Sequence, residues 1–145
     1  MIDLMDYLII FAVFIIVVIT VRKSSQVEKQ KKREKVTALF LGRTPLTTQQ
    51  FYEKHYQALG VPFEIIEKVK TILEEVLQED LSCLSVEDDF SQNLSFFWDF
   101  DSMADVELIL SIEEAFGITI SDTEAQKTHT IDDIIKLIVS KTKAP

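Results

Sequence analysis

Hydrophobic residues are distributed very unevenly along this chain of 145 residues, with one long apolar run near the N-terminal end. From Tyr7 to Val21 all residues except one threonine are apolar or aromatic, and the run reaches Leu4 if Asp6 is tolerated near an interface. A membrane-spanning helix needs ~20 apolar residues, so the run is only slightly short of that length. We therefore predict a transmembrane anchor over residues 1–21.

A cleaved signal peptide is the competing interpretation of this run. Signal peptides begin with basic residues and end at a cleavage site made of small residues. This chain instead carries Asp3 and Asp6 before the run, and Arg22-Lys23 directly after it. No lipoprotein cysteine follows the run. We therefore favour an uncleaved anchor.

Basic residues gather on the C-terminal side of the run, and they indicate its orientation. Lys and Arg residues that flank a membrane span tend to stay in the cytoplasm. We therefore predict a single-pass protein of the inner (cytoplasmic) membrane, N-out, with a basic stalk or linker over residues 22–44 and a cytoplasmic C-terminal domain. The basic run either lies along anionic lipid headgroups or serves as a solvated topology signal and helical stalk. Its basic residues are Arg22, Lys23, Lys29, Lys31, Lys32, Arg33 and Lys35.

The rest of the chain has apolar residues at helical spacing and no alternating strand pattern of useful length. The sequence Gly42-Arg43-Thr44-Pro45 breaks any helix that continues from the stalk. A short amphipathic helix is predicted from Thr47 to Leu59, within residues 45–60, and a longer helix from Pro62 to Glu79. The longer helix and a last helix have apolar stripes at i, i+3, i+4 and i+7. These stripes are Ile66, Val69, Leu73, Val76 and Leu77, and Ile131, Ile134, Ile135, Ile138 and Val139.

Helix starts can be recognised where Ser or Thr is followed three residues later by Asp, Glu or Gln. Four such pairs occur: Thr47 with Gln50, Ser102 with Asp105, Ser121 with Glu124, and Thr130 with Asp133. Together with the apolar stripes they predict an all-α protein. A transmembrane helix and a short extra amphipathic helix precede a small four-helix bundle over residues 61–145, whose third helix is short, near Ser121 to Thr128.

Charge divides the chain in the same way as hydrophobicity. Residues 1–60 carry a net charge of +4, and residues 61–145 carry −13. The acidic domain lacks the Lys/Arg surface that neutralises phosphates, so we exclude nucleic acid as its ligand. The basic surface of another protein is a better match for such a domain.

Other candidate chemistry is sparse. Cys83 is the only cysteine, so no intrachain disulfide can form, and we interpret this residue as a packing residue. His55 and His129 do not lie in a metal-ligand spacing. The pair Asp99 and Asp101 is too unspecific to predict a metal site, and an EF-hand loop counted from Asp99 lacks the required Gly and Glu. We therefore predict no metal site and no catalytic constellation.

The most informative segment runs from Asp101 to Gly117 and reads DSMADVELILSIEEAFG. Helical spacing predicts a core stripe with Ile109 beside it, made of Leu108, Ile112, Ala115 and Phe116. A second face mixes apolar and acidic side chains, namely Met103, Glu107, Leu110 and Glu114. This face either docks on a basic enzyme or is an ordinary solvated surface. Ser102 is either a helix cap or a site that holds a phosphodiester at the positive end of the helix.

These residues resemble the prosthetic-group segment of acyl carrier proteins. The resemblance covers roughly Phe63 to Ile138, and its most specific part is Asp101-Ser102-Met103 with Val106-Glu107, Glu113-Glu114 and Phe116. The segments Ile118 to Asp122 and Thr130 to Asp133 also look like the family's entries into the third and fourth helices.

The resemblance implies that Ser102 carries 4'-phosphopantetheine, with Asp101 as the flanking residue of the motif. Ser102 would attack the pyrophosphate of coenzyme A in a reaction catalysed by a separate, Mg-dependent phosphopantetheinyl transferase. Glu107 and Glu114 match family positions that meet basic partner enzymes. We therefore predict a partner-binding surface made of Met103, Val106, Glu107, Leu110 and Glu114.

The resemblance further implies a carrier that catalyses nothing itself. It would hold an acyl or aminoacyl group as a thioester for lipid, polyketide or envelope-component biosynthesis. Acyl-activating enzymes, synthases or acyltransferases with basic docking surfaces would act on that group.

The chain departs from the family pattern just before Asp101, where a loop is predicted that is longer than usual, lacks the usual glycine and is strongly aromatic. The aromatic side chains either complete the core or form a surface toward a partner or the membrane; they are Phe96, Phe97, Trp98 and Phe100. This departure motivates the alternative function, in which an unmodified carrier-like domain acts as a membrane-tethered protein-interaction adaptor.

Overall fold

A computed structural model describes residues 2–143, so the first residue of the predicted anchor and the last two of the predicted C-terminal domain lie outside it. The described residues form helices, and their only β-type pairing is one isolated bridge between Asp89 and Thr130. This confirms the predicted all-α class. The elements are α1 (Leu4–Phe40), α2 (Thr48–His55), the 3₁₀ helix η1 (Gln57–Leu59), α3 (Phe63–Leu77), α4 (Phe96–Phe100), α5 (Ala104–Phe116), α6 (Asp122–Gln126) and α7 (Ile131–Thr142).

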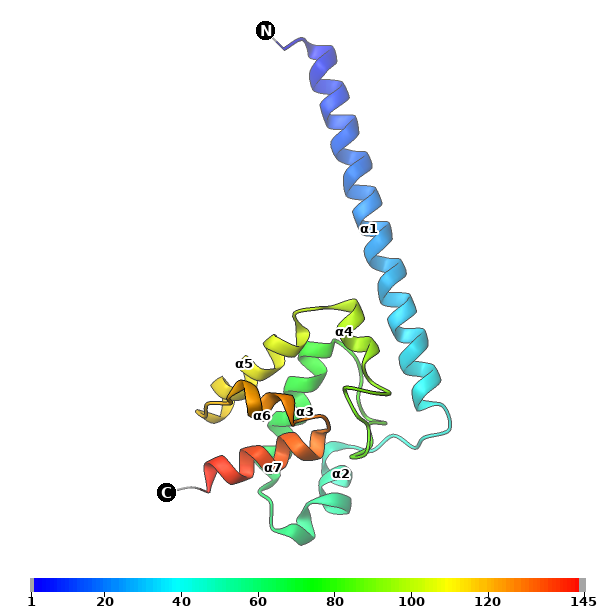
Figure 1. Cartoon of the computed structure of the whole chain (residues 1–145). Helices are drawn as coiled ribbons and strands as arrows, with labels where there is room; N and C mark the ends of the chain where they lie inside the picture. The colour runs from blue at the N-terminus through cyan, green and yellow to red at the C-terminus, as the bar shows by residue number, and fades with distance from the viewer. Residues whose placement is uncertain (1, 144–145) are drawn as a thin grey trace.

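Helix α1 joins the predicted anchor and the predicted stalk in one continuous helix (Figure 1). Its 37 residues correspond to a length of ~55 Å at 1.5 Å per residue. Its N-terminal half is long and apolar enough to cross a membrane, and none of that half is buried against the rest of the protein. The helix ends at Phe40, and Gly42 follows with a φ of 77°. The break predicted at Gly42 to Pro45 is therefore confirmed.

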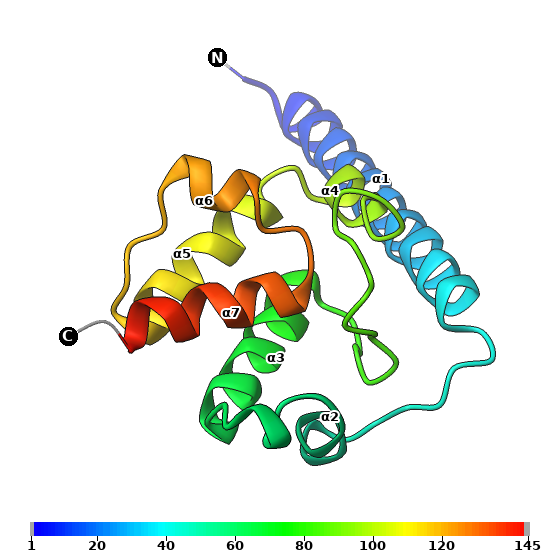
Figure 2. The same ribbon diagram turned by 60° about the horizontal axis from the view of Figure 1, so that its bottom comes forward.

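The core of the domain is built around α3, which packs against α2, α5 and α7. The apolar stripes predicted for α3 and α7 point inward, and only Val139 among them is partly exposed. The capping boxes at Thr47, Ser121 and Thr130 are all present, with hydrogen bonds in both directions. Figure 2 shows α7 crossing α3 on one side of the domain, with α5 and α6 beside it.

Two predictions about helix extent need correction. The helix predicted from Thr47 to Leu59 is divided into α2 and η1, because Tyr56 leaves α-helical geometry and buries its ring in the core. The Tyr56 hydroxyl donates a hydrogen bond to Asp132 Oδ1 at 3.1 Å. In α5, Ala115 is exposed and does not belong to the core stripe, whereas Leu108 and Ile112 are buried and Phe116 packs partly buried against the core.

The aromatic segment before Asp101 is the helix α4, whereas the sequence predicted a loop. Phe96 and Phe97 are buried, and Trp98 is partly buried and donates its indole N–H to the Phe90 carbonyl at 2.9 Å. These contacts favour the interpretation that the aromatic side chains complete the core. Helix α4 also packs against α1, and both views show it between α1 and the rest of the domain (Figures 1 and 2).

Candidate functional site

The predicted site lies in the short turn that joins α4 to α5. Asp101 ends α4 by donating its backbone N–H to the Phe97 carbonyl at 3.3 Å. Its side-chain Oδ1 accepts the Met103 N–H at 3.0 Å, and its backbone carbonyl accepts the Ala104 N–H at 3.2 Å. Asp101 therefore fixes the turn on both sides of Ser102, which is exposed at its apex.

Ser102 does not cap the helix, so the predicted capping box with Asp105 is wrong. Helix α5 begins at Ala104, and Met103 is its N-cap residue without a side-chain cap. The Asp101 carboxylate takes the acceptor role that the sequence assigned to Ser102, while the Asp105 carboxylate accepts the Val106 N–H. Within residues 2–143 no hydrogen bond to the exposed Ser102 hydroxyl is found.

The turn fits a covalently attached phosphate. A phosphodiester on Ser102 would project into solvent, just before the N-terminus of the 13-residue helix α5. The N-terminal end of a helix carries a partial positive charge that stabilises an anion within the first turn. The Asp101 carboxylate is engaged as an acceptor within the turn and would hold the geometry of the turn rather than contact the phosphate.

All five residues of the predicted partner-binding surface are exposed on α5 or at its start. Met103 is 62% exposed, Leu110 58% and Val106 46%. Glu107 and Glu114 are also exposed, and neither forms an ion pair within the described residues. The structure therefore brings apolar and unpaired acidic side chains together on one helix face.

A groove of about 760 Å³ adjoins this face, between α5, α6 and the segment that leads into α4, and Val106 and Leu110 also line it. Its walls are largely apolar and include Phe90, Trp98, Leu108, Ile109, Ile120 and Ala125. Sequence reasoning missed this groove, because its walls come from four separate segments of the chain. Trp98 and Ile109 are only partly buried in the folded domain, and their spacing along the sequence does not indicate this.

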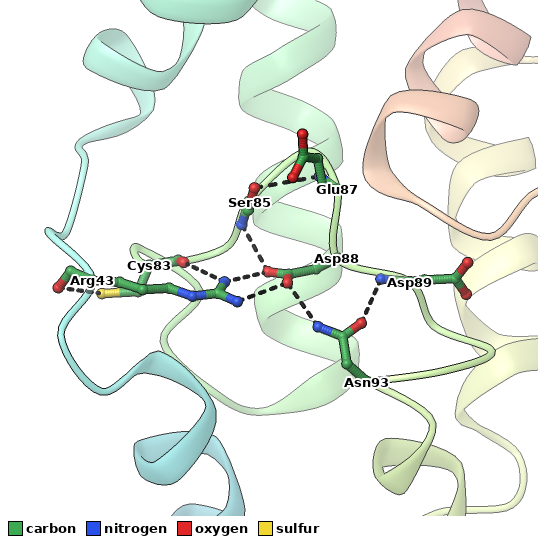
Figure 3. A network of polar contacts seen from close by, with 7 residues as sticks. All are labelled: Arg43, Cys83, Ser85, Glu87, Asp88, Asp89 and Asn93. Carbon is green, nitrogen blue, oxygen red and sulfur yellow. Dashed lines mark hydrogen bonds and ion pairs between the residues drawn. The ribbon is translucent and has the colours of Figure 1, made fainter.

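The loop between α3 and α4 is held by a polar network around Asp88, which the sequence analysis also missed (Figure 3). Arg43 donates to both carboxylate oxygens of Asp88, at 2.6 Å and 3.0 Å. The Ser85 N–H and the Asn93 side-chain amide each add a hydrogen bond to Asp88 at 2.8 Å. Burial by itself raises the pKa of Asp88, but Arg43 and these donors outweigh it and lower the pKa below its usual value.

Residues 2–143 contain no group of three His, Cys, Asp or Glu side chains placed to hold a metal ion. The half-buried Cys83 belongs to the network just described, where its Sγ lies 3.9 Å from the Arg43 carbonyl oxygen. The His55 ring packs against Phe51, with the two ring centroids 5.0 Å apart. These residues are engaged in packing rather than gathered at one site.

Comparisons with known proteins find a matching family and similar curated proteins. The family described as "Phosphopantetheine attachment site" matches residues 67–138, a range that includes Ser102. The "Acyl carrier protein" of Thermosynechococcus vestitus is 40% identical over 81 residues, which make up 56% of this chain and 95% of that protein. The "Acyl carrier protein" of Picosynechococcus sp. is 37% identical over 81 residues, with the same coverage of 56% and 95%.

Proposed function

Because the chain belongs to the acyl carrier protein family, whose members bear covalently bound 4'-phosphopantetheine, we propose that Ser102 is its attachment residue and that the chain is a membrane-anchored carrier. The observation that carries this proposal is the Ser102 hydroxyl itself, which is exposed and unbonded in a turn fixed by Asp101. A serine that capped its helix would have to give up that hydrogen bond before it could react.

In the attachment reaction this chain supplies the nucleophile and its position. The Ser102 oxygen attacks the phosphorus of the coenzyme A pyrophosphate that bears pantetheine, and it loses its proton to a base of the transferase. The bond from this phosphorus to the bridging oxygen breaks, and the nucleotide portion of coenzyme A leaves with the other phosphate. The thiol of the attached group then holds cargo as a thioester.

The groove beside α5 supports an acyl group as the cargo. Its apolar walls would remove a hydrocarbon chain from water, which is favourable in proportion to the buried apolar area. An aminoacyl cargo would place a charged ammonium against these walls, at a desolvation cost. We therefore propose lipid-like acyl groups ahead of aminoacyl groups, with transferase, activating and acyltransferase enzymes meeting the exposed face of α5.

The apolar half of α1 supports the membrane anchor, because nothing within residues 2–143 buries it. An anchor would confine the thioester to the neighbourhood of membrane enzymes and so raise its effective concentration there. The basic residues after the apolar run support the N-out orientation, with the domain in the cytoplasm.

Intact-mass spectrometry of the full-length protein from its native host tests the attachment site. We expect the wild-type protein to carry the mass of phosphopantetheine, and Ser102→Ala to lack it. Ser95→Ala removes another exposed serine, seven residues earlier, and should keep the modification. Modification of Ser102→Ala would overturn the site assignment. A wild-type chain that stays unmodified even after incubation with coenzyme A and a broad-specificity transferase would favour the adaptor function.

A further inference from the structure

Helix α1 is fixed to the carrier domain by contacts from two successive turns. The Lys32 ammonium donates to the Leu77 carbonyl at 2.7 Å and lies 3.8 Å from Glu79 Oε1, with its side chain only 15% exposed. One turn later, Val36 is 7% exposed and belongs to the hydrophobic core. These contacts make α1 a rigid support rather than a flexible tether.

The aromatic helix α4 makes the remaining contacts in the joint between α1 and the carrier domain. The Lys35 ammonium lies over the rings of Phe96 and Phe100, 5.8 Å and 5.6 Å from their centroids. A cation over the face of an aromatic ring is attracted by the negative charge density of that face. Since α4 leads directly into the turn that contains Ser102, the joint fixes the position of that turn relative to α1.

A cleft of about 200 Å³ between α1 and the turn shows which residues of α1 lie opposite the turn that contains Ser102. Its walls include Ser25 and Lys29 of α1, and Phe100, Asp101 and Ala104 on either side of Ser102. Figure 1 shows the connection from α4 to α5 at the end of the domain that lies toward the N-terminal half of α1. Ser102 therefore lies on the side of the domain from which the apolar half of α1 projects.

The residues of α1 that face the turn lie close to the end of the apolar run. Ser25 follows Val21, the last residue of the run, by four residues, or ~6 Å along a helix. The polar headgroup layer adds roughly 5–8 Å to each side of the hydrocarbon core of a bilayer. A helix that crosses the bilayer near its normal would thus place Ser25 and the facing turn in or at the headgroup layer.

We propose that the bilayer surface is a docking partner of the carrier domain, and that Ser102 is held at the lipid headgroup layer. The thioester would then be delivered to an acceptor at that surface, a lipid or a group on a membrane-embedded enzyme. This inference rests on the proposed function, because it assigns the class of acceptor to the same site.

The chemistry of the delivery follows from the thioester. A hydroxyl or amine of the acceptor attacks the thioester carbonyl carbon, and the C–S bond breaks. The proton lost by the acceptor ends on the released thiol, so the step needs no oxidant or further co-reactant.

The depth of residue 102 can be measured without attached phosphopantetheine. We would place a fluorophore on Ser102→Cys in the full chain, in a Cys83→Ser background, and reconstitute it in nanodiscs whose lipid headgroups carry a quencher. A matched label at the exposed Leu59 reports the opposite end of the domain. We expect strong quenching at residue 102 and little at residue 59.

A second variant tests whether the length of α1 sets the depth of residue 102. Seven polar helix-forming residues inserted between Val21 and Arg22 lengthen α1 by about 10 Å while nearly preserving the direction in which the domain faces. Quenching at residue 102 should fall to the level at residue 59. Equal quenching at both positions in the natural chain, or no change after the insertion, would overturn the inference.

Failure of this inference is distinguishable from failure of the proposed function. The insertion variant with its natural Ser102 should still accept phosphopantetheine from a soluble transferase, since that turn is unchanged. Modification without quenching would leave a carrier that works away from the membrane surface. Quenching without modification would leave a membrane-docked domain that is not a carrier.

Discussion

At the residue scale, Asp101 does more for the site than its place beside Ser102 suggests. Its carboxylate accepts the Met103 N–H and so closes the turn that exposes the serine hydroxyl. A hydrogen-bond acceptor is needed here, and a negative charge is not required for this role.

Two substitutions separate the hydrogen-bond acceptor of Asp101 from its negative charge. We expect Asp101→Ala to lower the free energy of unfolding by about 1 kcal/mol, as loss of a helix cap does, and to slow the modification of Ser102. Asp101→Asn keeps an acceptor oxygen and should be nearly normal in both respects. Urea unfolding and time-resolved mass spectrometry of transferase reactions measure the two effects. If Asp101→Asn is as slow as Asp101→Ala, the charge matters to the transferase and the turn does not.

A second residue-scale prediction concerns Asp88, whose carboxylate is buried and receives four hydrogen bonds. Asp88→Asn leaves Arg43 without its charged partner and should cost about 2 kcal/mol of unfolding free energy at pH 7. The pKa of Asp88 is lower in the folded than in the unfolded state. Its contribution is therefore complete above the ordinary Asp value of about 4 and is lost as the pH falls through the lowered value.

Denaturant unfolding of Asp88→Asn and wild-type protein over a range of pH checks this prediction. The difference between the two proteins should be constant near neutral pH and should shrink in acid. Glu87→Gln is the matched control, since Glu87 is adjacent and exposed and accepts no hydrogen bond from Arg43. A difference that persists unchanged below the lowered pKa would show that packing, not ionisation, is the main contribution of Asp88.

At the scale of elements, the outer face of α5 combines acidic residues that steer a partner with apolar residues that hold it. We expect Glu107→Lys with Glu114→Lys to slow association with a basic transferase about tenfold at low ionic strength. The effect should diminish at high salt, because salt screens exposed charges. Stopped-flow or surface-based binding kinetics measure the association rate.

The matched control changes net charge by the same amount on another helix. Glu67→Lys with Glu75→Lys alters two exposed residues of α3. This pair should affect association much less than the pair on α5. Equal effects of the two pairs would mean that total charge, rather than the α5 face, steers the encounter.

The elements that sequence predicted well are those with strong local signals. Helices α3 and α7 have regular stripes of Ile, Leu and Val, and Thr130 with Asp133 forms the capping box that its spacing indicates. The cap at Ser102 failed because a neighbouring carboxylate, on Asp101, competed for the same turn. Local spacing cannot decide between two acceptors one residue apart.

Other features depend on contacts between distant segments, and no local pattern encodes them. Helix α4 contains three Phe residues and one Trp in five positions, so it has no periodicity from which a helix could be predicted. Its packing against α1 joins two segments that are far apart in the sequence. The same is true of Lys32, which the sequence places in the basic stalk and which donates to the Leu77 carbonyl, 45 residues further along the chain.

At the scale of the whole molecule, the distribution of charge is compatible with a carrier domain held close to a membrane surface. The basic residues of α1 lie between the apolar half of the helix and a domain with a net charge of −13 over residues 61–145. Without these basic residues, an anionic bilayer would repel the acidic domain when the two are close together. Lys29, beside the turn that carries Ser102, is one of these intervening cations.

The same basic residues predict the orientation of the chain in the membrane, because Lys and Arg beside a span are retained in the cytoplasm while Asp and Glu have little influence. In spheroplasts the carrier domain should be protected from an added protease, and in inverted membrane vesicles it should be digested. Asp3→Lys with Asp6→Lys places positive charge on the N-terminal side and should produce a mixture of both orientations. Asp3→Asn with Asp6→Asn removes the negative charges alone and should leave the orientation unchanged. Digestion of the domain in intact spheroplasts would place Ser102 outside the cytoplasm, away from coenzyme A, and would contradict both the orientation and the carrier function that depends on it.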